Sequence, residues 1–106
     1  MTFYGTIANV KCRMDLDFES GKGTLSYNTK GSKMLNLKVL ERIDYGGVKT
    51  YDDMTIEEYD YNGNYTGKMV GQFDSIVFCG GEEYTPFGGY IRRDGKEFDF
   101  YFEISN

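Results

Sequence analysis

Two segments of the chain alternate strictly between apolar and polar side chains, and this pattern constrains the fold more than any other feature. One covers residues 10–19 and the other residues 97–104. A helix would spread the apolar residues of such a segment around its circumference, whereas a strand places them all on one face. Both segments are therefore predicted to be strands with one buried face. Their apolar members are Val10, Cys12, Met14, Leu16 and Phe18, and Phe98, Phe100, Phe102 and Ile104.

Turn signals divide the rest of the chain into short segments of the same kind. Residues 20–23 and 93–96 are predicted hairpin turns, and Asn62-Gly63 suits a two-residue type I′ turn, which needs two positive φ angles. In the strand predicted over residues 65–73, period two places Tyr65, Gly67 and Met69 on one face. No helical pattern longer than a turn or two occurs between these signals.

The composition supports a sheet protein. Tyr (10) and Phe (8) dominate the apolar residues, and 14 Gly suit tight turns. Parallel pairing would need long crossovers, so the strands must pair in an antiparallel way. We expect an all-β fold with a single domain over residues 1–106. It would be an antiparallel up-and-down meander of about eight strands, a small closed or nearly closed β-barrel with an interior filled by side chains.

The order of these signals resembles the small exported β-meander domains, calycin-like barrels, of uncharacterised proteins from Bacteroidetes and other Gram-negative bacteria. The resemblance implies a periplasmic, cell-surface or secreted location, although composition alone leaves a cytoplasmic one open. The domains have no functional residues established as a group, and none are carried over. The matching positions are Tyr4 to Ile7, Gly21, Gly23, Tyr27, Leu35, Leu37, Ile56 to Asp60, Gly63, Thr66-Gly67, Gly71, Phe73, Gly89 to Ile91, Asp94 to Lys96 and Phe98 to Phe102.

Several kinds of chemistry are disfavoured. The absence of His removes the commonest general base and the imidazole metal ligands. The net charge of −5 argues against nucleic acid, because phosphate binding needs a basic face. No apolar run approaches the roughly 20 residues that span a bilayer, so membrane insertion is not expected. We predict no cofactor and no catalytic residue.

Oxygen-bearing side chains suggest two kinds of site, a calcium loop and a pair of catalytic carboxylates. Asp60, Asn62 and Asn64 have the alternate spacing that opens a calcium loop, but Tyr65 stands where that loop needs Gly, so a hairpin turn is the better interpretation. Adjacent carboxylates such as Glu57-Glu58 could suggest glycoside hydrolysis. Neighbours on a strand point to opposite faces, so neither member is expected to share a site with the other.

Cys12 and Cys79 are the two cysteines of the chain. The simpler interpretation of Cys12 is a buried free thiol that packs as a small apolar residue. A Cys12–Cys79 disulfide is the alternative, and it would imply an oxidising compartment.

The abundance of tyrosine is the sequence feature that says most about function. Six tyrosines fall in or near predicted loops and strand ends, where a ring with a hydrogen-bonding tip favours contact with a protein or glycan. These are Tyr45, Tyr51, Tyr59, Tyr61, Tyr65 and Tyr84. Our first hypothesis is a non-catalytic binding or interaction module of the bacterial cell envelope with a tyrosine-rich, acidic loop face. A carrier of small apolar ligands is the alternative, and a carboxylate-based hydrolase is a remote one.

Overall fold

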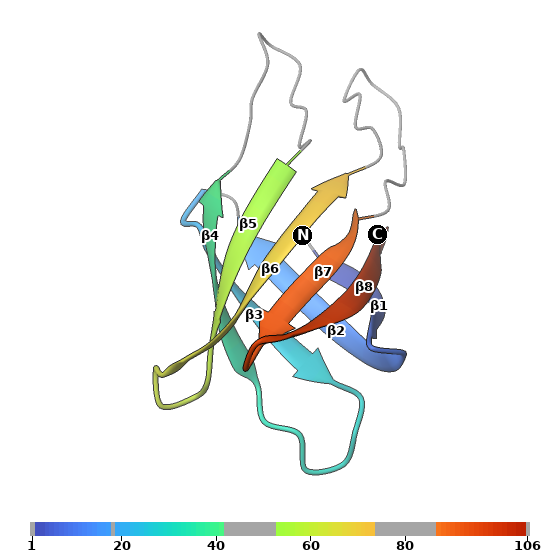
Figure 1. Cartoon of the computed structure of the whole chain (residues 1–106), viewed down its shortest axis with the longest axis vertical. Coiled ribbons are helices and arrows are strands. Elements are labelled where there is room, and N and C mark those ends of the chain that lie inside the picture. Colours follow the sequence, from blue (N-terminus) through green and yellow to red (C-terminus); the bar gives the residue numbers. More distant parts are fainter. Residues whose placement is uncertain (1, 18, 42–52, 74–86, 106) are drawn as a thin grey trace, which may run out of the picture.

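Eight strands make up the secondary structure of the computed structural model, which describes residues 2–17, 19–41, 53–73 and 87–105 (Figure 1). The prediction of an all-β fold is confirmed. Residues 2–7, which precede the first alternating segment, form a strand of their own. The strands are β1 (Thr2–Ile7), β2 (Val10–Asp17), β3 (Lys22–Tyr27), β4 (Leu35–Glu41), β5 (Asp53–Tyr59), β6 (Tyr65–Phe73), β7 (Phe87–Arg93) and β8 (Lys96–Ser105).

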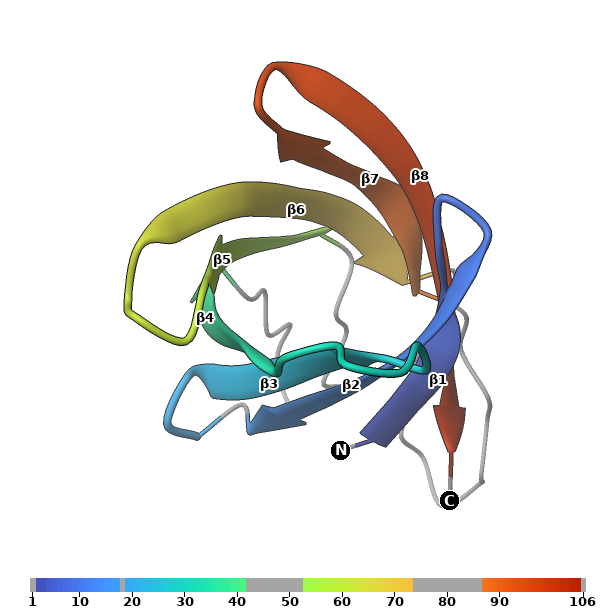
Figure 2. The same cartoon turned by 90° about the horizontal axis from the view of Figure 1, so that it is seen from below.

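Each strand pairs in an antiparallel way with the strand before and after it, and the meander closes into a barrel. The seam lies between the first and last strands, where β1 pairs with β8 over the whole length of β1. Figure 2 shows the strands curving around one interior, with β1 beside β8. The described sheet therefore has no unpaired edge strand, which removes a common site of aggregation.

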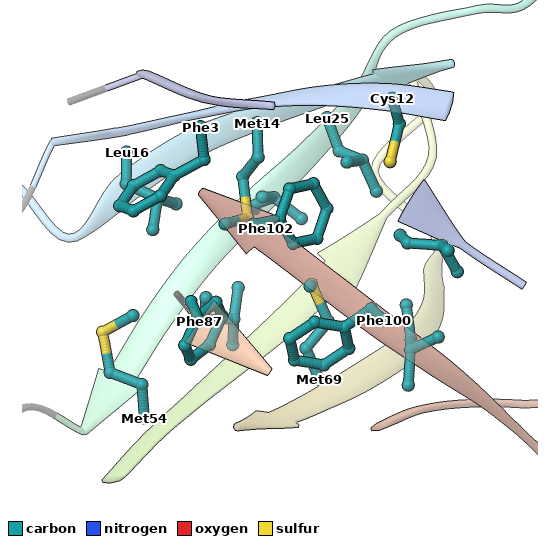
Figure 3. Packing of buried hydrophobic residues seen from close by; sticks show 14 residues of the cluster. Phe3, Cys12, Met14, Leu16, Leu25, Met54, Met69, Phe87, Phe100 and Phe102 are labelled. Atoms are coloured by element: carbon teal, nitrogen blue, oxygen red, sulfur yellow. The ribbon is translucent and has the colours of Figure 1, made fainter. Parts of the chain in front are cut away.

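Inward and outward residues follow the predicted alternation from Lys11 to Asp17. The prediction that Val10 shares the buried face is wrong, since Val10 is 39% exposed at the start of β2, beside the β1–β2 turn. Lys11, Arg13 and Asp17 of β2 are exposed, whereas the apolar residues Cys12, Met14 and Leu16 are buried. Side chains from strands all around the sheet meet inside the barrel (Figure 3). The buried apolar residues of the described chain are Phe3, Ile7, Cys12, Met14, Leu16, Leu25, Leu37, Met54, Ile56, Met69, Phe87, Ile91, Phe100 and Phe102.

Phenylalanine rings fill the middle of this core. The rings of Phe87 and Phe100 have their centroids 5.1 Å apart, and those of Phe100 and Phe102 are 5.8 Å apart, both in tilted arrangements. Such pairs are favourable beyond the apolar area that they bury. The described part of the interior is thus packed with side chains, as we expected for a barrel of eight strands.

The seam requires a glycine. A Cβ atom on Gly5 would lie 1.9 Å from the backbone oxygen of Tyr101 and 2.7 Å from the Cα atom of Phe102. Separations below 3 Å are not seen for real Cβ atoms, so any side chain at Gly5 would force β1 and β8 apart. Closure of the barrel therefore depends on this position.

Four connections lie at one end of the barrel, at the bottom of Figure 1: β1–β2, β3–β4, β5–β6 and β7–β8. The β2–β3 turn lies at the opposite end, where β4 and β6 also end. Residues 42–52 and 74–86 lie outside the described residues. Phe18 lies outside them too. The two ends of the chain also lie at that opposite end.

Two hairpins use type I′ turns, but only one of them was predicted. The turn at Asp94-Gly95 is confirmed, with φ angles of 51° and 73° between the paired residues Arg93 and Lys96. In the β1–β2 turn, Ala8 and Asn9 have φ angles of 50° and 66°. Ala carries a steric penalty in this left-handed conformation, so the sequence has no turn signal there.

The type I′ turn predicted at Asn62-Gly63 is wrong. Tyr59 pairs with Tyr65, which leaves a five-residue loop over 60–64, and of the Asn62-Gly63 pair only Gly63 has a positive φ. The Asp60 carboxylate organises this loop, since its Oδ1 accepts hydrogen bonds of 2.9 Å from the backbone N–H groups of both Asn62 and Asn64. The Asn64 bond is the main reason why the pKa of Asp60 is lowered.

Replacing Ala8-Asn9 by Asn-Gly should stabilise the protein, because Asn and Gly adopt the left-handed conformation at lower cost than Ala and Asn. We expect the A8N/N9G variant to gain about 1 kcal/mol, or roughly 5 °C in melting temperature, in thermal and urea unfolding. The matched control is Asp94→Asn in the other type I′ turn, which should change stability by less than about 0.5 kcal/mol. A loss of stability in A8N/N9G would contradict the described turn.

Candidate functional site

The structure describes three of the six predicted tyrosines. Tyr45, Tyr51 and Tyr84 lie outside the described residues, so their part in a binding face stays a prediction. Tyr59, Tyr61 and Tyr65 lie together at the β5–β6 hairpin. The candidate site described below therefore concerns the β5–β6 hairpin and the wall beside it.

A β-bulge turns Tyr65 outward. Glu58 pairs with Gly67, but the next residue of β5, Tyr59, pairs with Tyr65, so β6 has one extra residue, Thr66, at this point. The bulge breaks period two, and Tyr65 is 56% exposed instead of sharing the buried face of Gly67 and Met69 as predicted.

The rings of the hairpin make ordered contacts. Those of Tyr59 and Tyr65 meet edge to face, with centroids 5.8 Å apart. The Tyr59 hydroxyl donates a 3.0 Å hydrogen bond to Glu57, which raises the pKa of Tyr59. Tyr61 is 58% exposed, and the Lys33 ammonium lies 4.1 Å from its ring centroid. These contacts orient the rings at the hairpin.

Next to Tyr65, the outer wall has a shallow depression of about 380 Å³, which we call the β6–β7 groove. Tyr65 and Tyr90 supply its aromatic rings, and Val70 adds apolar surface. The guanidinium carbon of Arg92 lies 5.9 Å from the Tyr90 ring centroid. The residues that line the groove are Tyr65, Thr66, Lys68, Val70, Tyr90, Arg92, Asp94 and Gly95.

Two cations stand side by side in this groove. Lys68 of β6 and Arg92 of β7 are directly paired in the register, where like charges repel. Arg92 also donates a 2.5 Å hydrogen bond to Glu97, which raises the pKa of Arg92. None of the ion pairs between described residues includes Lys68. The groove therefore contains two neighbouring cations, of which Arg92 is paired with Glu97, on a protein whose net charge is −5.

Sequence reasoning missed Lys68, Tyr90 and Arg92. All three occupy the outward phase of alternating strands, where polar residues are ordinary, so no local signal distinguished them. Only the register between β6 and β7 brings them together.

The interior contains a polar cluster at the same end of the barrel. Glu58 is 1% exposed and forms a two-pronged ion pair with Arg93, whose Nε and terminal nitrogen donate to Glu58 Oε1 and Oε2 at 2.9 and 2.5 Å. Burial favours the neutral form of Arg93, but the hydrogen bonds and charge of Glu58 outweigh it, so the pKa of Arg93 is raised. Such fork geometry is the strongest form of this pair.

Neighbouring residues complete the surroundings of the ion pair. The Thr66 hydroxyl lies 2.9 Å from Glu58 Oε1, to which it donates a hydrogen bond. Gly67 leaves space, since a Cβ there would lie 2.9 Å from Arg93 Cγ and 3.3 Å from Glu58 Oε1. The Arg93 guanidinium lies 5.5 Å from the ring centroid of Tyr27. Burial raises the pKa of the Tyr27 phenol. Glu58 is thus buried with hydrogen bonds from Arg93 and Thr66, and a bonded polar network of this kind is typical of a structural element.

Sequence period alone could have suggested this pair. Glu58 follows Met54 and Ile56 on the inward phase of β5, and Arg93 follows Ile91 on that of β7. Two opposite charges at inward positions must be paired if both are buried. The prediction that Glu57 and Glu58 point to opposite faces is confirmed, since Glu57 is half-buried on the wall and Glu58 lies inside.

Cys12 is a buried free thiol in the structure. Burial raises its pKa to about 11, an effect that the nearby positive charge of Arg93 opposes. A thiol with such a pKa is almost wholly protonated at neutral pH and is a poor nucleophile. This agrees with the simpler interpretation of Cys12, and Cys79, the other cysteine of the alternative disulfide, lies outside the described residues.

Among the described residues, no three His, Cys, Asp or Glu side chains gather closely enough to hold a metal ion. The same part of the chain contains no helix long and apolar enough to cross a membrane. No protein family model matches the chain, and neither a curated protein nor a solved structure matches it.

Removing one member of the buried ion pair should be costly. Glu58→Met leaves the Arg93 charge without its partner, and Arg93→Met does the same to Glu58, so each change should destabilise the protein by about 3 kcal/mol or more in urea unfolding. The double variant E58M/R93M removes both charges and should regain most of that loss, to within about 1 kcal/mol of the natural protein. If the two losses simply add in the double variant, the described ion pair is not coupled.

Proposed function

We propose that this protein is a non-catalytic carbohydrate-binding module and that the β6–β7 groove is its contact site. The observation that supports the proposal is the combination of two tyrosine rings, Tyr65 and Tyr90, with charged and hydroxyl groups in one open depression. Sugar rings present apolar faces that stack on aromatic side chains and hydroxyl edges that bond to polar ones. Lys68 and Asp94 can supply such polar contacts.

The size of the groove favours a glycan over a protein partner. Its volume of about 380 Å³ lies in the range of about 300–1,000 Å³ that small ligands and their parts occupy. A stable protein interface needs about 800 Å² on each partner, with an apolar centre. The large exposed apolar residues of the described chain instead belong to five different strands and two of the connections. They are Tyr4, Val10, Met34, Leu40, Tyr61, Tyr65 and Tyr101.

The groove is also held rigidly. The β6–β7 ladder fixes the backbone beneath it, the bulge at Thr66 turns Tyr65 outward, and Tyr59 supports the Tyr65 ring from the side. A preformed aromatic surface loses little conformational entropy when a ligand binds. This suits a module that binds weakly but repeatedly along a polysaccharide.

The other two functions receive no comparable support. An apolar-ligand carrier needs a hollow barrel, whereas the described interior is filled by the core around Phe100. A carboxylate-based hydrolase needs a free acid, whereas the buried Glu58 is tied to Arg93. Export to the periplasm or cell surface, and calycin-like ancestry, are part of the proposal through the resemblance of the sequence.

A panel of oligosaccharides, neutral and acidic, tests the proposal by isothermal titration calorimetry. We expect at least one hexasaccharide to bind, and Tyr90→Ala to weaken it about tenfold, because a stacked ring contributes roughly 1–2 kcal/mol. Tyr4→Ala is the matched control, since Tyr4 is a half-exposed tyrosine on β1, away from the groove, and it should bind as the natural protein does.

Retention of full affinity by Tyr90→Ala would exclude the β6–β7 groove as the site. Failure of every oligosaccharide to bind would refute the proposed function. Hydrolysis of any of them during the titration would contradict the non-catalytic part of the proposal.

A further inference from the structure

A second depression lies on the outer wall, and Tyr59 separates it from the β6–β7 groove. This β3–β4 groove, of about 360 Å³, is formed mainly by β3, β4 and the turn before β3. Lys22 and Lys38 lie in it and are directly paired in the register, as Lys68 and Arg92 are in the first groove. Its lining residues are Ser20, Gly21, Lys22, Gly23, Asn36, Leu37, Lys38, Val39 and Tyr59.

The register connects both grooves in one row of charged residues, which we call the charge row. Each member is paired with the next on the neighbouring strand, and all of them belong to the outward phase. In order around the wall they are Asp17, Lys22, Lys38, Glu57, Lys68, Arg92 and Glu97. The row thus contains two pairs of neighbouring cations with a single carboxylate, Glu57, between them.

Aromatic rings lie beside the gap between the two cation pairs. Tyr59 lines the β3–β4 groove and Tyr65 lines the β6–β7 groove, and the two rings touch each other. The cations that face each other across Glu57, Lys38 and Lys68, are two strand spacings apart, or about 10 Å along the wall. One monosaccharide can occupy only one groove, whereas an oligosaccharide can reach both.

We propose that the charge row binds an acidic polysaccharide in which carboxylate-bearing residues alternate with neutral ones. One carboxylate would lie between Lys68 and Arg92, another between Lys22 and Lys38, and a neutral residue would cross Glu57 against Tyr59 and Tyr65. This inference rests on the proposed function and specifies the class of glycan.

Charge complementarity supports this ligand over others. Neighbouring cations repel each other, and among the described residues the three lysines of the row belong to no ion pair, whereas Arg92 is paired with Glu97. Glu57 would repel a carboxylate placed on every sugar residue, as would the overall charge of −5. A neutral chain would leave both cation pairs unused.

Three hexasaccharides separate these cases by calorimetry at low salt. A hyaluronan hexasaccharide alternates acidic and neutral residues, a galacturonate hexasaccharide is acidic throughout, and an N-acetylglucosamine hexasaccharide is neutral. We expect hyaluronan to bind most tightly, to weaken as salt is added, and to bind much better than its own disaccharide, because only the longer chain reaches both cation pairs.

Charge-removing variants locate the contacts. Lys68→Met and Lys38→Met should each weaken hyaluronan binding about fivefold and their combination about twentyfold, the range expected for exposed charge contacts. Neither should affect the neutral hexasaccharide. Lys30→Met is the matched control, since Lys30 is an exposed lysine outside both grooves, and it should leave hyaluronan binding unchanged.

The outcomes distinguish this inference from the proposed function. If the neutral chain binds as well as hyaluronan, and Tyr90→Ala weakens both while the lysine variants weaken neither, the carbohydrate-binding function stands and the acidic specificity is wrong. Tightest binding of the galacturonate chain would also refute the alternating pattern. If none of the three binds, the failure lies in the proposed function.

Discussion

The close approach of β1 to β8 is the constraint on which the rest of the structure depends. Gly5 of β1 packs directly against β8, where a side chain would overlap the backbone of Tyr101. Without this contact the meander would be an open sheet with two exposed edges, and its apolar face would need another cover. With it, the eight strands enclose their own core, and the whole outer surface of the wall becomes available for other uses.

Closure also determines where function can lie. A barrel of this strand number has little interior space, and here the described interior is occupied by aromatic and aliphatic side chains and by the Glu58–Arg93 ion pair. The paired carboxylate and guanidinium satisfy each other at one end of the core, so they offer nothing to a ligand. The charged and aromatic side chains of the candidate site lie on the outside of the barrel. The register aligns the charges there, and the bulge at Thr66 exposes Tyr65.

Much of the fold could be predicted from the sequence because strand burial has a period of two residues. The alternation in β2 and β8 is nearly uninterrupted, and the Asp94-Gly95 turn carries the signal that its φ angles require. Features that depend on register could not be predicted in the same way. The bulge shifts the pairing of β6 by one residue and so turns Tyr65 from the inner to the outer face. Lys68 and Arg92 are neighbours only through the pairing of β6 with β7, which residues 74–86 separate in the sequence. Ala8 shows a third limit, because the closed hairpin imposes a φ angle that Ala does not favour.

Hydrogen exchange of backbone amides, followed by NMR, tests the closed barrel most directly. If β1 and β8 are paired, the amide protons that bond across the seam should exchange only through global unfolding, as slowly as those between β6 and β7. Seam amides that exchange many times faster, while the β6–β7 amides stay protected, would show that the sheet is open and would contradict closure of the barrel between β1 and β8.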